Sequence, residues 1–151
     1  MILPNTPAEV LANYIVNQGW AGWPEDVPTW NVSINKLPDV PDQNKGLPWL
    51  AVYDRKAVQD SVRMRTGERG EFWGWQILVR GKTDNDAYSK LSQIATGFDA
   101  LYLAPIAITT SNYTIQRVKR NDQPTFLKQE ERANMRIWTM EGTASIYLQG
   151  S

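Results

Sequence analysis

The sequence contains neither cysteine nor histidine. Without cysteine the fold cannot be held by disulfides, and thiolate nucleophiles and thiolate metal ligands are excluded. Without histidine the chain lacks the most common general base and metal ligand. It also lacks a glycine-rich phosphate-binding loop and a G-x-S-x-G nucleophile motif. We therefore expect a protein that is not an enzyme and that uses no metal or cofactor.

Net charge and long apolar runs are missing as well. Lys and Arg total 16, and Asp and Glu also total 16, so no overall field would attract nucleic acid or an anionic membrane. No apolar run approaches the roughly 18 residues of a membrane span, and the first residues do not resemble a leader peptide. We expect a soluble protein made in the cytoplasm, with no membrane partner and no specific nucleic-acid recognition.

The most informative stretch is 71–101, where the hydrophobic period changes from two to about 3.6. Residues 73–79 alternate, which predicts a strand with one buried face in the middle of a sheet. After Thr83 or Asp84, the candidate N-caps, a helix is predicted to lie across that sheet. Its expected apolar stripe contains Ala87, Tyr88, Leu91, Ile94, Ala95, Phe98 and Leu101.

The rest of the chain predicts one more helix and several short strands. Thr6 and Pro7 begin a capped amphipathic helix over about 7–18, and Gly19 is placed to end it. Strands are expected at 30–34, 49–53, 105–110, 113–119 and 135–148, with a tight turn at Ser111 and Asn112. Residues 120–131 are expected to form a polar loop, and Gly142 to mark a bulge or bend. The 151 residues thus predict a single α+β domain with a mainly antiparallel sheet and two helices packed on it.

Two further features are candidate functional sites. Residues 54–70 have little to bury, and we expect this loop to become ordered when Arg63, Arg65 and Arg69 meet carboxylates on a partner. A solvated, weakly ordered excursion or a frayed hairpin without a docking role is the alternative. Arg117, Lys119 and Arg120 form a basic patch at a strand end, for which a solubilising or edge-blunting role is the simpler explanation. The seven tryptophans are best explained as core packing, with an assembly surface or a carbohydrate-binding face as alternatives.

A series of short patterns resembles the tail terminator, or tail-completion (minor capsid), family of long-tailed bacteriophages. The order of the patterns along nearly the whole chain carries the resemblance, and each is short. At residues 133–134 this chain has Ala and Asn where the family often has a basic or aromatic residue. The patterns are the capped helix PAEVLANYIV, LPD at 37–39, PD at 41–42, VYD at 52–54, QILVRG at 76–81, Ala87 with Tyr88, YTI at 113–115, and Pro124 with Glu130, Glu131 and Arg132 before the last strand.

The resemblance implies a structural virion protein. Such proteins form a ring, usually a hexamer, at the head-proximal end of the tail tube, stop tube polymerisation and present a docking surface for the head. The implied partners are further copies of the chain, the tail tube protein and the head-tail connector or stopper protein. The residues we expect at assembly interfaces are Arg63, Arg65, Arg69, Glu130, Glu131 and Arg132.

Three other interpretations remain open at this point. The chain could be another neck or tail component, such as a stopper or a tube protein. It could be a binding module that uses exposed tryptophans, for example on glycans. An enzyme built on a Ser-Lys pair is the third, although no motif marks one.

Overall fold

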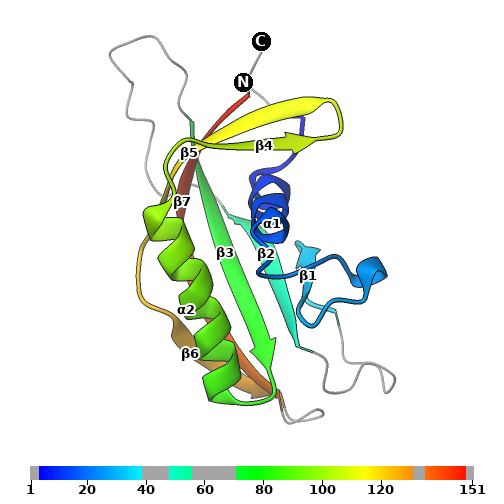
Figure 1. Ribbon diagram of the computed structural model, residues 1–151. Helices are drawn as coiled ribbons and strands as arrows, with labels where there is room; N and C mark the ends of the chain where they lie inside the picture. Colours follow the sequence, from blue (N-terminus) through cyan, green and yellow to red (C-terminus); the bar gives the residue numbers. More distant parts are fainter. Residues whose placement is uncertain (1–3, 39–47, 56–70, 131–134, 149–151) are drawn as a thin grey trace.

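Two helices pack on one face of a seven-stranded sheet in the computed structural model, which describes residues 4–38, 48–55, 71–130 and 135–148 (Figure 1). The sheet is antiparallel except where its first two strands pair in parallel. The predicted α+β class is therefore confirmed. The elements are α1 Pro7–Asn17, the 3-10 helix η1 Pro24–Asp26, β1 Asn31–Ile34, β2 Trp49–Arg55, β3 Glu71–Gly81, α2 Asp84–Ala100, β4 Ala104–Ile108, β5 Ser111–Arg120, β6 Thr125–Glu130 and β7 Met135–Leu148.

The last strand, β7, organises the sheet, whose order is β1-β2-β3-β7-β5-β4 with β6 added beside β7. One side of β7 pairs with the whole of β3. Its other side pairs with β5 over its C-terminal half and with β6 over its N-terminal half. Consequently β5 and β6 lie end to end along β7, and the outward edge of β6 has no strand partner in the described part of the chain.

The predicted centre of the fold, strand 73–79 against the helix that follows it, is confirmed. Trp75, Ile77 and Val79 are fully buried on the helix-covered face of β3. On α2, the buried Phe98 meets the Trp75 ring edge-on, with the ring centroids 5.3 Å apart. Thr83 is the N-cap of α2, since its hydroxyl accepts a hydrogen bond from the Asp86 N–H.

Helix α1 begins as predicted, but a second side chain also caps it. The Thr6 hydroxyl accepts from the Glu9 N–H, while Asp54 at the end of β2 accepts from the Ala8 N–H at 2.8 Å. A carboxylate at this position also suits the positive end of the helix dipole. After the helix, Gly19 adopts a φ of +79°, as its predicted C-terminal role requires.

Four local predictions are wrong. Residues 125–130 form β6 and not a loop, because backbone pairing with β7 holds a strand whose own side chains are mostly exposed. The hairpin turn falls at 109–110, since Ile108 already pairs with Ser111. Asp54 belongs to β2 and not to the following loop, because it pairs with Trp75.

The fourth error concerns Gly142, which lies in regular pairing opposite both Trp75 and Arg120. The irregular registers occur instead between 115 and 117 in β5 and between 126 and 128 in β6. At Gly142 a side chain would collide with the Lys119 carbonyl oxygen and the Trp75 ring. The glycine therefore allows a close approach and does not bend the strand.

Candidate assembly surfaces

Of the six residues predicted at assembly interfaces, only Glu130 lies in the described part of the chain. Arg63, Arg65, Arg69, Glu131 and Arg132 fall outside it, as does most of the 54–70 segment expected to dock.

Glu130 ends β6 beside a buried arginine of β3. Its carboxylate lies 3.5 Å from Arg80 Nη1, and the Arg80 side chain is only 3% exposed. The same Nη1 donates to the Pro38 carbonyl oxygen at 2.7 Å. A buried guanidinium needs such partners. Glu130 therefore has a structural role as a partner of Arg80, independent of any role at an assembly interface.

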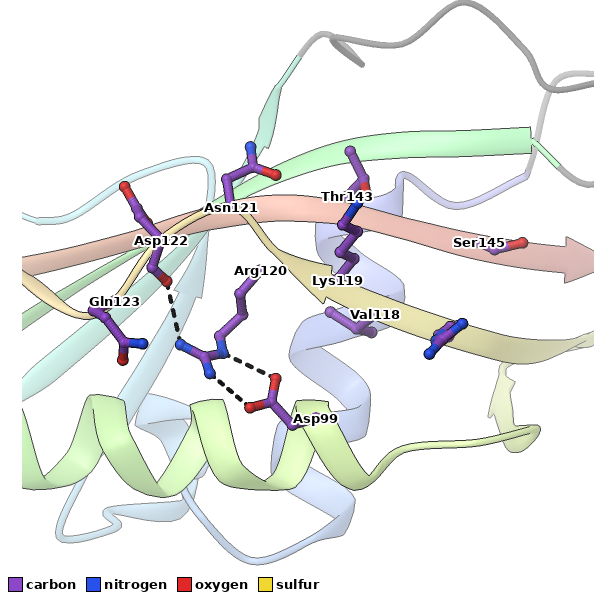
Figure 2. A pocket seen from close by; sticks show the side chains of 10 residues that line it. Asp99, Val118, Lys119, Arg120, Asn121, Asp122, Gln123, Thr143 and Ser145 are labelled. Atoms are coloured by element: carbon purple, nitrogen blue, oxygen red, sulfur yellow. Dashed lines mark hydrogen bonds and ion pairs between the residues drawn. The ribbon is translucent and has the colours of Figure 1, made fainter.

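The predicted basic patch lies in a concavity of about 710 Å³ at the end of β5. We call this surface the basic concavity. Figure 2 shows its two sides: Arg120 points toward α2, whereas Thr143 and Ser145 project from β7. Its lining residues are Asp99, Arg117, Val118, Lys119, Arg120, Asn121, Asp122, Gln123, Thr143 and Ser145.

Arg120 is held in place by Asp99. Its guanidinium donates Nη2 and Nε to the two carboxylate oxygens of Asp99 at 2.6 and 2.9 Å (Figure 2). The hydrogen bond from Arg120 lowers the pKa of Asp99, and the hydrogen bond to Asp99 raises the pKa of Arg120. The pair fixes the end of α2 to β5 and leaves Arg120 with little charge to offer a partner.

The other two cations of the concavity differ from Arg120. Arg117 and Lys119 are exposed, and neither has a hydrogen-bonded or ion-pair partner within the described residues. Alternate positions of a strand point to the same face, so both side chains leave one face of β5 from Cα atoms about 7 Å apart. An adjoining hollow of about 510 Å³ extends the surface to Tyr102, whose side chain is 74% exposed. This region can hold anionic groups next to an aromatic ring.

A second surface is an aromatic cluster where β6, β7 and α2 meet. The Trp138 ring lies edge-on to Tyr88 and to Phe126, with ring centroids 5.3 and 5.9 Å apart. Arg136 lies over the Phe126 ring at 5.6 Å, and Trp138 Nε1 donates to Asp84 at 3.0 Å. Tyr88 is 46% exposed, so its predicted place on the buried stripe is wrong: it extends the stripe onto the surface.

A third surface lies beside the edge strand β1, where the chain passes from η1 into that strand. Glu25, Asp26 and Val27 are all exposed, and the Val27 side chain is 87% exposed. Val27 also has a φ of +49°, a conformation that is costly for a β-branched residue. We call residues 24–27 the acidic tip, since neither carboxylate has a side-chain partner in the described chain.

The tryptophans belong mainly to the core, as predicted. Trp75 is fully buried and Trp49 is 8% exposed. The other five are partly buried and pack against the core cluster. Trp30 also receives the Lys90 ammonium, which lies 5.3 Å from its ring centroid and donates to the Trp20 carbonyl oxygen. Burial lowers the pKa of Lys90.

Within the described ranges, no group of three or more acidic residues could hold a metal ion. In the same ranges, no helix is long and apolar enough to cross a membrane. The surfaces above can bind partners through charge, aromatic contact and open strand edges.

Sequence reasoning found the basic patch but missed the acidic tip and the aromatic cluster. The exposed Val27 stands in a stretch rich in proline and tryptophan, where no period marks a surface. The cluster joins residues 88, 126 and 138 through pairing of β6 with β7, which the predicted loop had excluded. The unusual feature of the tip is the positive φ of Val27, and a backbone angle can be seen only in the structure.

No known protein family and no curated protein matches the chain. One solved structure, of a protein that carries no functional name, is similar over 80% of this chain and 81% of its own. The two share 15% sequence identity, with a TM-score of 0.42. A likeness this distant bears on neither family nor function.

Proposed function

We propose that the chain is a structural subunit of a bacteriophage tail that assembles into a ring at the head-proximal end of the tail tube, six-fold as is usual in the family that its sequence resembles. There the ring would stop tube polymerisation and present the surface on which the head docks. Its partners would be further copies of itself, the tube protein and the head-tail connector or stopper protein, and its location the virion.

The observation that carries the proposal is the distribution of exposed apolar side chains. Among the residues that the structure describes, they occur in three separate places: Val27 at the acidic tip, Tyr102 and Leu103 beside the basic concavity, and a group on α2 and β6. The last group contains Tyr88, Phe126 and Leu127. A ring subunit needs two different lateral surfaces, and a terminator needs axial ones as well. Three separate patches fit that requirement, whereas a single groove would fit a binding module.

Two alternatives are less well supported. A glycan-binding face would use exposed tryptophans, yet all seven tryptophans lie in the described residues and each is buried or partly buried. A tube protein uses similar lateral contacts but stacks into filaments, so assembly behaviour separates it from a terminator.

Electron microscopy of the purified protein, with its mass in solution measured by light scattering, tests the proposal. We expect closed rings with a central hole, and tubes of limited length when the ring protein is added to polymerising tube protein. Filaments of the protein alone would identify a tube protein instead. A monomer that neither self-associates at high concentration nor limits tube length would refute the proposal.

A further inference from the structure

The acidic tip and the basic concavity are complementary in three respects. The tip carries two carboxylates without side-chain partners in the described chain. The concavity is lined by three cations and two carboxylates, which leaves one net positive charge, and its exposed cations Arg117 and Lys119 have no side-chain partner in the described chain. The tip projects one exposed apolar side chain, Val27, and Tyr102 provides an exposed apolar surface beside the concavity. The tip is a short turn that projects from the molecule beside β1 (Figure 1), whereas the concavity is a hollow of about 710 Å³.

A single subunit cannot bring these two surfaces together. The tip lies next to β1, at one end of the sheet, and the concavity lies at β5, with β2, β3 and β7 between them. Four strand spacings amount to about 19 Å. In Figure 1 the tip is at the right, beside β1, and the chain that leaves β5 is at the left, behind α2. Their complementarity can be used only between molecules.

We propose that the acidic tip of one copy of this chain docks into the basic concavity of the next, which makes the tip and the concavity the two halves of the lateral interface. This inference rests on the proposed ring. It assigns the interface to residues outside the set that the sequence predicted. The occupant of the concavity is a second copy because the same chain carries the matching convex, acidic and apolar surface.

The geometry of the contact is head-to-tail, because each copy contributes a different surface. Such an interface closes into a ring when the rotation between neighbours divides a full turn. Backbone hydrogen bonds hold the turn of the tip in the single subunit: the Asp26 N–H donates to the Trp23 carbonyl oxygen and the Val27 N–H to the Pro24 carbonyl oxygen. The turn therefore exists before docking, and less order has to be gained on binding. Arg120 is already neutralised by Asp99 and serves as the rigid wall of the concavity.

Charge reversal on one side at a time tests the interface. Variant A combines Glu25→Lys with Asp26→Lys, and variant B combines Arg117→Glu with Lys119→Glu. Variant A then has two positive surfaces and variant B two negative ones. Each variant alone should need at least about a tenfold higher concentration for half-assembly, measured by analytical ultracentrifugation.

The decisive experiment mixes variant A with variant B. In an alternating ring, the positive tip of A meets the negative concavity of B, and the negative tip of B meets the positive concavity of A. Equimolar A and B should therefore assemble at the wild-type concentration, and so should one chain carrying all four substitutions. The matched control, Lys82→Glu with Lys128→Glu, reverses two exposed cations outside both surfaces and should assemble like wild type.

Circular dichroism melting shows that each variant is folded before it is scored. The inference is overturned if A or B assembles like wild type, or if both fail and their mixture fails too. Those results leave the ring itself in place, because the wild-type protein would still assemble. If the wild type does not self-associate under any condition, both the ring and this interface are wrong.

Discussion

At the scale of single residues, the pair formed by Asp99 and Arg120 makes stability depend on pH. The hydrogen bond from Arg120 holds the pKa of Asp99 below its usual range, so the carboxylate stabilises the fold above pH about 4. This contribution is lost as pH falls through the lowered pKa. It is small, below about 1 kcal/mol, because half of the Asp99 side chain is exposed.

Asp99→Asn should therefore lower the free energy of unfolding at pH 7 slightly, and the difference from wild type should shrink as pH falls below about 4. Urea titrations from pH 7 to pH 3 measure it. Glu141→Gln, which alters an exposed carboxylate outside the acidic tip and the basic concavity, is the matched control. A difference that stays constant with pH would mean that the ion pair contributes no proton-linked stability.

Gly142 is a second residue whose role follows from its neighbours. Any side chain there meets the Lys119 carbonyl oxygen and the Trp75 ring, and neither can move without disturbing the paired strands or the core. Gly142→Ala should cost about 1–3 kcal/mol in the free energy of unfolding, by chemical denaturation. Thr143→Ala, one position along and half-buried, should cost less; equal costs would show that β7 relaxes around the added methyl group.

At the scale of elements, α2 and β3 hold the core between them. Ile77 and Leu91 are fully buried, so truncating either to alanine should cost about 2–5 kcal/mol. Ser92→Ala, beside Leu91 but off the apolar stripe, should change stability little. Denaturant titration of the three variants compares them directly, and comparable losses at positions 91 and 92 would contradict the observed packing of α2.

Elements could be predicted from the sequence where one face is buried and the other is not. That condition holds for α1, α2, β3 and β7, whose apolar residues recur at a regular period. The condition fails for β6, where five of six side chains are exposed. Backbone hydrogen bonds to β7 hold this strand, and they require no apolar pattern in its sequence. The turn at 109–110 was missed for a similar reason: Thr109 takes a φ of +53° without the glycine or asparagine that usually signals it.

At the scale of the whole molecule, the candidate surfaces depend on contacts between distant parts of the chain. The sequence identifies Arg117, Lys119 and Arg120 as neighbours, but nothing in it pairs Arg120 with Asp99, 21 positions earlier. Nor does the sequence show that η1, beside β1, is separated from β5 by three strands of the same sheet. Contacts between distant parts of the chain determine both the Asp99–Arg120 pair and the distance between η1 and β5. Composition therefore predicted a surface with charges of both signs, but not where on the surface those charges lie.

The central place of β7 also sets the order in which the subunit can mature. Residues 135–148 are made after every other described element, yet β3, β5 and β6 all pair with them, and Thr143 and Ser145 line the basic concavity. At about 5–20 residues per second, a growing chain carries its acidic tip for several seconds before it has a concavity. Without β7 the sheet is not complete, so an unfinished chain presents neither surface in its docking shape and cannot join a ring. Ribosome-bound chains stopped at residue 130 should be digested by protease as readily as unfolded chains, whereas chains extended by a linker beyond residue 151 should resist; early resistance would show that the sheet forms without its last strand.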